Sequence, residues 1–230
     1  MRRTALMMLA ILALVWLIAA VSQAPASARA ASASGAPEGV WVWVDIHRKS
    51  LTVYRGDEAL AQYPIATGAY ATPTPIGVYR VNSRFAGEMS GFGTCFLGLN
   101  VPWGQYGLHG TNKPGSIGSN ASHGCVRMRV KDAEAVYKLV PNGARVVMEG
   151  GPYGQLDTTL RTLRAGDRNS HVAAVQSRLR QLGYYAGSSD GVFGQGTIAA
   201  VRKARKALRL PESDTVDHAL YRALGLILFE

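Results

Sequence analysis

One short part of the chain combines the side chains that a cysteine nucleophile needs. Residues 122–127 (SHGCVR) contain Cys125 with a histidine and an arginine, and residues 109–111 (HGT) add a second histidine in glycine-rich sequence. A thiol attacks as the thiolate, and its ordinary pKa of ~8.5 leaves little thiolate near neutral pH unless a base or a cation assists. These residue types therefore predict nucleophilic thiol chemistry.

His109 is the better candidate for the base. His123 stands two positions before the cysteine, so on an extended segment its side chain points the same way and is poorly placed to meet the sulfur. A histidine from a separate strand can approach the sulfur directly. Glycine lets the backbone approach a ligand closely, and the N–H groups of Gly124 and Cys125 are predicted to form an oxyanion hole.

Two other interpretations of Cys125 stay open on the residues alone. A cysteine in a secreted protein is usually half of a disulfide, and the chain has just one other cysteine, Cys95. A second thiol within reach would also allow a reversible, inactivating disulfide. Imidazole and thiolate suit zinc as well, so His109, His123 and Cys125 are a candidate metal site, although no fourth ligand stands at a familiar spacing.

The same residues resemble the signature of the L,D-transpeptidase catalytic domain. The segments that carry the resemblance are residues 109–111 (HGT), 122–128 (SHGCVRM), 72–77 (TPTPIG) and 97–104 (LGLNVPWG). The resemblance runs from about residue 39 to residue 148. One departure is Cys95, because related sequences often carry a basic residue there.

The resemblance implies an activity and a set of roles. It implies that Cys125 is the nucleophile, that His109 is the general base and that the Gly110 carbonyl orients the imidazole. The substrate class would be the stem peptides of peptidoglycan, which a thioester passes to an acceptor amine, or to water in a carboxypeptidase. No metal and no organic cofactor is expected. A non-catalytic wall-binding protein, with its cysteines bridged, is the alternative from another class.

Further positions match the signature without a fixed role. His123, Gly124, Ser122 and Arg127 are candidates for the oxyanion hole or for orienting the substrate. Arg127 either binds a substrate carboxylate through its planar guanidinium or pairs with a buried acid. Ser122 is either a structural hydrogen-bonding residue or a catalytic one.

Residues 1–30 predict a signal peptide or an N-terminal membrane anchor. Residues 5–21 are apolar throughout, follow two arginines and lead into small residues suited to cleavage. Either way we expect an exported protein in the cell wall or on the outer face of the cytoplasmic membrane, whose N-terminal segment contacts the membrane during export. Export and the scattered basic residues argue against nucleic acid as a partner. The net charge of +10 either attracts the protein to an anionic cell wall or belongs to basic side chains that are only solvated.

The pattern then predicts a linker at residues 31–38 and a mainly β domain at residues 39–149, which the resemblance makes a β-sandwich. The predicted strands are residues 40–46, 50–54, 59–65, 77–83 and 144–148, with one helix at residues 131–139. The helix follows the Cys125 motif directly, so we expect it to brace that segment.

A second linker is predicted at residues 150–162, before a small all-α domain at residues 163–227. Apolar residues at helical spacing predict its three helices: Val172, Val175, Leu179 and Leu182; Ile198, Val201 and Leu208; Leu220 and Leu224. Residues 163–167 (LRAGD), 183–185 (GYY) and 190–194 (DGVFG) resemble a peptidoglycan-binding domain, which implies glycan as a partner.

This second resemblance has departures. Ala204, Arg205 and Arg209 stand where an aromatic residue, glutamine and glycine are expected. Losing a buried aromatic side chain typically costs ~3–5 kcal/mol unless a neighbour fills the space, for which Leu208 and Tyr221 are candidates. Tyr184 and Tyr185 either stack on sugar rings or are a pair of rim residues of the core.

Overall fold

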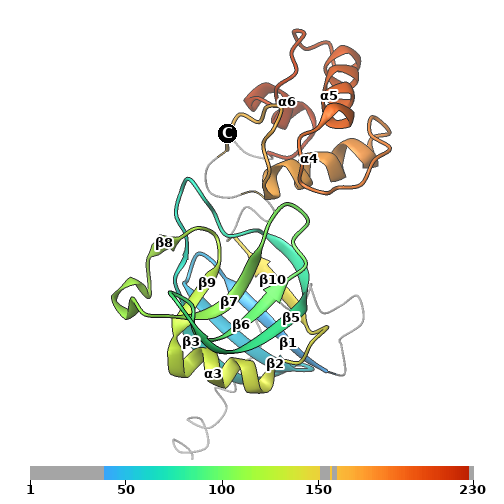
Figure 1. Ribbon diagram of the computed structural model, residues 1–230. Helices are drawn as coiled ribbons and strands as arrows, with labels where there is room; N and C mark the ends of the chain where they lie inside the picture. The colour runs from blue at the N-terminus through green and yellow to red at the C-terminus, as the bar shows by residue number, and fades with distance from the viewer. Residues whose placement is uncertain (1–38, 151–155, 157–159, 228–230) are drawn as a thin grey trace, which may run out of the picture.

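The computed structural model describes residues 39–150, 156 and 160–227, which form a β domain and a helical domain (Figure 1). The predicted fold class, a mainly β domain plus a small helical one, is confirmed. Within the described ranges, no helix is both long and apolar enough to cross a membrane. The predicted targeting segment, the linker at residues 31–38 and most of the linker at residues 150–162 lie outside the described residues.

Eight strands of the β domain form one continuous sheet in the order β3-β2-β1-β10-β5-β6-β7-β9. Their bounds are β1 Val40–Asp45, β2 Ser50–Arg55, β3 Glu58–Pro64, β5 Gly77–Met89, β6 Gly93–Leu99, β7 Tyr106–Thr111, β9 Val126–Arg129 and β10 Arg145–Glu149. Two short strands, β4 (Thr67–Gly68) and β8 (Asn120–Ser122), pair separately. The pairs β1–β10 and β7–β9 are parallel, so each joins segments that are distant along the chain.

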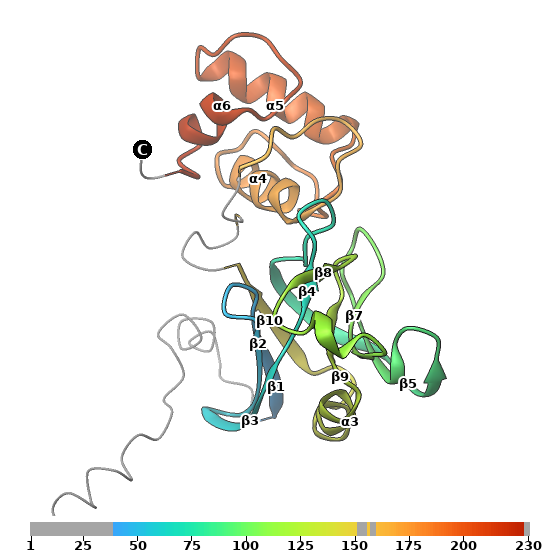
Figure 2. The ribbon, with the colours of Figure 1, turned by 90° about the vertical axis from the view of Figure 1, so that its left-hand side faces the viewer.

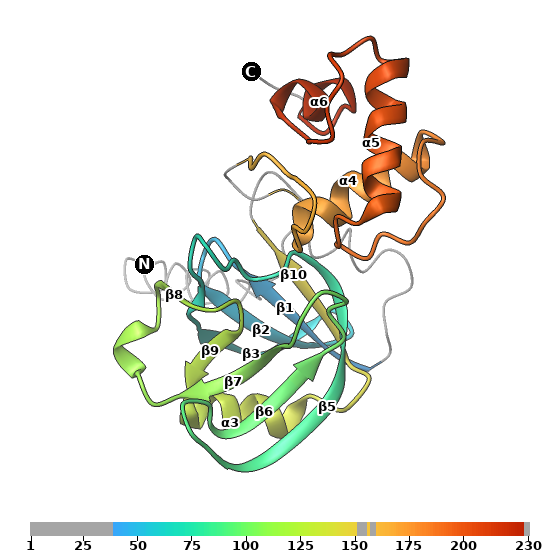
Figure 3. The ribbon, with the colours of Figure 1, turned by 45° about the horizontal axis from the view of Figure 1, so that its top comes forward.

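The long strand β5 bends the sheet into two facing halves. Its first residues pair with β10 and the remainder pairs with β6 (Figure 3). Val42 and Val53 from one half share a single apolar core with Leu97 and Leu108 from the other. The expected β-sandwich is therefore made from one bent sheet, and burial of both apolar faces stabilises the bend.

Helix α3 (Val130–Leu139) packs against β6, β7 and β9. Ala133 and Val136 on its buried face join the core of the β domain. An acidic residue in the first turn, Asp132, and a basic one in the last, Lys138, complement the helix dipole. The structure thus confirms the predicted helix and places it against the strand that follows Cys125.

The strands nearest Cys125 are the ones that the sequence pattern does not predict. The sequences GTCFLGL in β6, YGLHGT in β7 and VRMR in β9 are short and lack a regular alternation of apolar and polar residues. Strand β5 is also longer than predicted and ends at Met89. Glycine, histidine and arginine interrupt the alternation of apolar and polar residues in these strands, so the sequence pattern does not reveal them.

The helical domain contains α4 (Ser170–Gln181), α5 (Gln195–Ala207) and α6 (His218–Ala223) around a second apolar core. The predicted core residues Val172 and Leu179 are fully buried, whereas Leu182 lies beyond the end of α4 and is exposed. Tyr184 and Tyr185 are half-buried against this core, which favours their role as rim residues.

The departures in α5 are accommodated by local packing. Ala204 is fully buried, and the large side chain of Tyr221 fills the same core, as expected. Arg209 follows the end of α5 with φ of +57°, a left-handed conformation that favours glycine. The N–H of Leu210 still closes the helix by donating to the Arg205 carbonyl at 2.9 Å. Compared with glycine, an arginine in this left-handed conformation lowers the stability of the fold by roughly 1–2 kcal/mol.

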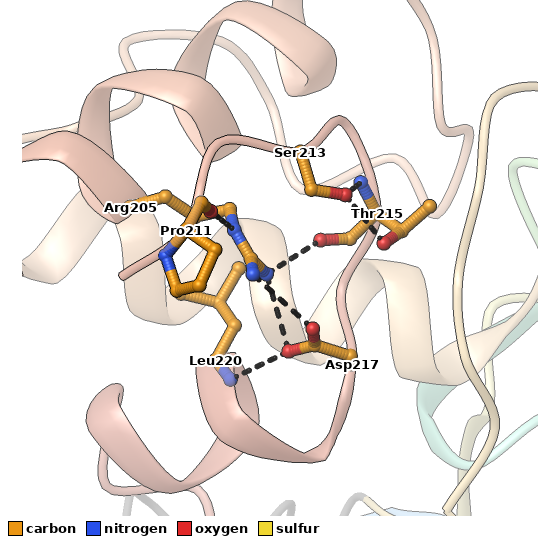
Figure 4. Close-up of polar contacts among 6 residues, drawn as sticks. All are labelled: Arg205, Pro211, Ser213, Thr215, Asp217 and Leu220. Carbon is orange, nitrogen blue, oxygen red and sulfur yellow. Dashed lines mark hydrogen bonds and ion pairs between the residues drawn. The ribbon is translucent and has the colours of Figure 1, made fainter. Parts of the chain in front are cut away.

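Arg205 is a buried cation that donates four hydrogen bonds (Figure 4). Its guanidinium donates to the carbonyls of Pro211 at 2.7 Å and Thr215 at 3.2 Å, and to both carboxylate oxygens of Asp217 at 3.1 and 3.2 Å. Asp217 also caps α6 by accepting the Leu220 N–H at 2.9 Å. Partial burial disfavours the ionised carboxylate, but the hydrogen bonds from Arg205 and Leu220 outweigh burial and lower the pKa of Asp217. Arg205 therefore ties the end of α5 to the start of α6.

The variant Asp217→Asn tests this buried pair, because asparagine can still cap the helix while the carboxylate is lost. We expect the free energy of unfolding to fall by about 1–2 kcal/mol, less than for a fully buried pair, since the Asp217 side chain is 39% exposed. Urea unfolding followed by circular dichroism measures the change. The matched control is Asp214→Asn in the exposed pair with Arg202, which should change stability little. Equal losses in the two variants would contradict the prediction.

Candidate active site

Cys125 immediately precedes β9 and lies beside β7. In this parallel pair His109 is aligned with Arg127, and Leu108 with Val126. Leu108 and Val126 are core residues, so the alternation of side chains places His109, Arg127 and Cys125 together on the other face of the sheet. The pairing therefore makes Cys125 a diagonal neighbour of His109, the residue predicted as its base.

His109 is enclosed by aromatic rings and is 2% exposed. The ring centroids of Phe92 and Phe96 lie 4.6 and 5.8 Å from the centre of the imidazole. Nδ1 is hydrogen-bonded to the Gly110 carbonyl, which is the contact that the resemblance implies. Since a carbonyl can only accept, the neutral ring carries its proton on Nδ1 and keeps a lone pair on Nε2.

Burial lowers the pKa of His109 to about 4, and the positive charge of Arg127 adds to this effect. The nearby carbonyls of Gly110 and Phe92 favour the protonated ring and oppose this effect without cancelling it. The imidazole is therefore neutral near pH 7. A neutral imidazole with a free lone pair is able to accept a proton, as a general base must.

The sulfur of Cys125 is half-buried. Burial raises the pKa of the Cys125 thiol, while a hydrogen bond from the Gly107 backbone and the charge of Arg127 oppose the rise. The resting pair is therefore a neutral thiol beside a neutral imidazole. Proton transfer must then accompany attack by the sulfur rather than precede it.

Ser122 organises the turn before Cys125. Its buried hydroxyl donates to the Cys125 carbonyl at 2.6 Å and accepts the Gly124 N–H at 3.0 Å. Gly124 has φ of +110°, and a Cβ atom there would begin 2.5 Å from the Tyr106 ring, so the turn requires glycine. Of the two donors predicted for the oxyanion hole, the Gly124 N–H is engaged by Ser122 in this structure. These contacts favour a structural role for Ser122.

Arg127 contributes a positive charge beside Cys125 and His109 without a matching carboxylate. Its Nη1 donates to the Ala121 carbonyl at 3.1 Å. The ion pairs in the described part of the chain do not include Arg127, so the alternative that it pairs with a buried acid is wrong. Its other N–H groups therefore face no acid of the protein in these ranges.

Cys95 and Cys125 are both free thiols on opposite faces of the sheet. Cys95 belongs to the core. The registers set Cys125 level with Gly98 of β6, two strands away, and Cys95 lies three residues from Gly98 along that strand. Strand geometry makes this separation about 14 Å, whereas a disulfide needs Cα atoms within about 7 Å. The alternative of a Cys95–Cys125 disulfide, permanent or reversible, is therefore wrong.

His123 stands apart from the other candidate residues, because its side chain is exposed. Across the residues that the structure describes, no three His, Cys, Asp or Glu side chains gather closely enough to hold a metal ion. The geometry therefore does not support the alternative zinc site of His109, His123 and Cys125.

Sequence reasoning misses the aromatic residues of the site. Phe92 and Phe96 enclose the imidazole, and Tyr106 lies against the turn before Cys125. The sequence signal is weak, because single aromatic residues beside glycines are typical of any protein core. Their positions depend on the pairing of β6 with β7, which sets Phe96 opposite His109.

Comparison with known proteins shows which families each domain resembles. Residues 39–148 match the family model of the L,D-transpeptidase catalytic domain. The β domain is therefore similar to L,D-transpeptidase catalytic domains. Residues 168–224 match the family model of a peptidoglycan binding domain, so the helical domain is similar to such domains.

Several known proteins are similar to the β domain. YkuD of Bacillus subtilis (strain 168), whose name assigns it to the L,D-transpeptidases, is 40% identical over 105 residues, which cover 46% of this chain and 63% of YkuD. YkuD of Bacillus licheniformis is 39% identical over 103 residues, covering 45% and 61%. The chain thus spans about three-fifths of the length of these curated relatives. A solved L,D-transpeptidase from Mycobacterium smegmatis is 24% identical, with a TM-score of 0.41, and the match covers 48% of this chain and 58% of that one.

The lowered pKa of His109 predicts that acid destabilises the β domain. The unfolded chain binds a proton at an ordinary pKa of 6.5 and the folded chain only near about 4, so protonation favours unfolding between these values. Protonation of His109 in the unfolded chain lowers the free energy of unfolding by about 3 kcal/mol over that pH range. Urea unfolding from pH 7 to pH 4 should show a smaller loss of stability in His109→Asn than in the unchanged protein.

The control for this experiment is His123→Asn, because His123 is exposed. From pH 7 to pH 4, the stability of the His123→Asn variant should fall as much as that of the unchanged protein. Parallel curves for all three proteins would show that His109 does not cause the loss.

Proposed function

We propose that the protein is an exported L,D-transpeptidase that cross-links peptidoglycan stem peptides through a thioester on Cys125. The observation that carries the proposal is the shared face of Cys125, His109 and Arg127 within a domain similar to L,D-transpeptidase catalytic domains. One nucleophile, one neutral base and one fixed cation are the groups that acyl transfer through a thiol requires.

In the first half of the reaction, the Cys125 sulfur attacks the carbonyl carbon of the third stem residue. The thiol proton passes to Nε2 of His109, whose Nδ1 stays bound to the Gly110 carbonyl. The bond to the terminal D-alanine then breaks, and His109 returns the proton to the leaving amine. The peptide is left as a thioester on Cys125.

In the second half, a side-chain amine of a neighbouring stem attacks the thioester, and His109 accepts the amine proton. The thiolate leaves and recovers a proton, so the reaction forms one amide bond for each amide bond that it breaks. Splitting the transfer into two steps lowers the barrier to each. Water in place of the amine would give the alternative product of an L,D-carboxypeptidase.

Arg127 supports both halves electrostatically. Its charge opposes the effect of burial on the Cys125 thiol and so stabilises the thiolate as it forms and leaves. Because the described residues offer it no carboxylate, its planar guanidinium also suits a carboxylate of the substrate.

The location and the second domain follow the same proposal. Residues 1–30 would direct export and contact the membrane, and the protein would act in the cell wall or on the outer face of the cytoplasmic membrane. The helical domain would hold the enzyme near glycan, helped by the net charge of +10 in an anionic wall.

Incubation of the full chain with purified tetrapeptide muropeptides tests the proposal. We expect a cross-linked dimer lighter by one alanine, resolved by mass spectrometry. Cys125→Ala should lose this activity by at least about 1,000-fold, because the nucleophile is removed. Cys95→Ala is the matched control and should retain it, since Cys95 lies on the opposite face of the sheet.

The products distinguish the alternatives. Tripeptide monomers without dimers would replace the transpeptidase with a carboxypeptidase that uses the same thioester. Unchanged muropeptides with every variant, together with binding to intact peptidoglycan, would replace it with a non-catalytic wall-binding protein.

A further inference from the structure

The helical domain contacts a loop of the β domain that joins β4 to β5 (Figure 2). The N–H of Ile76 in this loop donates to Ser170 Oγ, at the first residue of α4, over 2.7 Å. The Arg161 guanidinium lies 4.5 Å from the centre of the Tyr70 ring and also donates to the Tyr70 carbonyl. The two domains are therefore joined by specific polar contacts as well as by their linker.

A second contact is centred on Trp103, in the loop between β6 and β7. Its indole packs edge to face against Tyr79, with the ring centroids 6.2 Å apart. The indole also lies against Gly191 of the helical domain, where a Cβ atom would begin 2.3 Å from it. Val192 and Ala173 of the helical domain pack against the core of the β domain, to which Trp103 belongs. Trp103 is consequently only 9% exposed.

Trp103 reaches the Cys125 turn through Tyr106. Trp103 and Tyr106 pack in the same apolar core, and the Trp103 side chain opposes the rise that burial causes in the pKa of Tyr106. The Tyr106 ring lies against Gly124, so closely that only glycine fits there. Packing around Trp103 and Tyr106 thus joins the helical domain to the turn before Cys125.

The loop between β4 and β5 supports the same turn from another direction. The Ala69 N–H and the Thr72 hydroxyl both donate to the Ser122 carbonyl, at 2.9 and 3.1 Å. The Pro73 carbonyl would lie 3.3 Å from a Cβ atom at Gly124. The loop between β4 and β5 therefore contacts both the helical domain and the turn that presents Cys125.

We propose that Trp103 is a positioning residue of the Cys125 site, and that docking of the helical domain on Trp103 sets the orientation and water exposure of the thiol. The inference rests on the proposed function for the role of Cys125 as nucleophile. It assigns the helical domain a second role beside wall binding, because the domain completes the packing behind the nucleophile. Small displacements of a reacting group are costly, so the docked domain would affect the rate of the chemical step.

The variant Trp103→Phe tests the proposal in the full chain, because phenylalanine keeps an aromatic ring but loses the indole N–H and part of the contact with Gly191. We expect kcat for the muropeptide reaction to fall by about tenfold with KM changed less than about twofold, as for a misplaced reacting group. A thermal transition followed by circular dichroism shows whether the variant is folded. The variant Ser170→Ala removes the hydrogen bond from Ile76 and leaves Trp103 and Cys125 unchanged. It should lower kcat as well, but by less than Trp103→Phe does.

A second readout does not depend on transpeptidase activity. The rate of Cys125 alkylation by iodoacetamide is measured against pH, with peptide mapping to separate it from Cys95. Burial raises the pKa of Cys125 in the docked protein, so water admitted by Trp103→Phe should move the midpoint of the profile to lower pH. His109, Arg127 and Tyr106 also face the sulfur, and they are unchanged in this variant.

The control is Lys206→Ala on the exposed side of α5, which should match the unchanged protein in both readouts. An unshifted alkylation profile with unchanged kcat in Trp103→Phe would overturn the proposal, and so would a raised KM with unchanged kcat, which would make Trp103 a substrate-binding residue. If Trp103→Phe does not fold, an unshifted profile in Ser170→Ala overturns it. A shifted profile in a protein that leaves muropeptides unchanged would support the positioning role and count only against the proposed function.

Discussion

The parallel pairing of β7 with β9 is the constraint on which the site depends. It aligns His109 with Arg127 and makes Cys125, just before β9, a diagonal neighbour of the imidazole. A shift of one residue in this register would turn His109 toward the core and Leu108 toward the thiol, because side chains alternate along a strand. Burial of Leu108 and Val126 therefore secures the catalytic alignment through the hydrophobic effect.

Burial of the same face also determines the protonation of the site. The phenylalanine rings that enclose His109 remove water, so the neutral imidazole is favoured even though two carbonyls are close to it. The thiol is likewise favoured over the thiolate at Cys125. Arg127 supplies a permanent positive charge near the sulfur, which matters most when negative charge develops there.

The second domain shows how local departures from a family pattern can be absorbed. Arg205 is buried, and two carbonyls and a carboxylate accept four hydrogen bonds from it, so the loop before α6 is held in place. Tyr221 fills the core beside Ala204. The domain therefore keeps a packed interior and a defined surface, and that surface meets Trp103 and the loop between β4 and β5.

The sequence by itself determined the candidate site residues and the outline of the fold. Cys125, His109 and Arg127 were recognisable by residue type and spacing, and the periodicity of apolar residues predicted five strands of the β domain, α3 and the three helices of the second domain. Local patterns carry this information because amphipathic strands and helices repeat at fixed periods.

Only the tertiary structure decided which residues meet. Two cysteines could form a disulfide as far as the sequence shows, yet the sheet places Cys95 and Cys125 on opposite faces. The Gly124 N–H is engaged by Ser122. Trp103, Tyr106 and Phe92 lie near the site, although their local sequence does not indicate it. Strand register, side-chain burial and domain docking arise from contacts between segments that are distant along the chain, and no local pattern of residues encodes them.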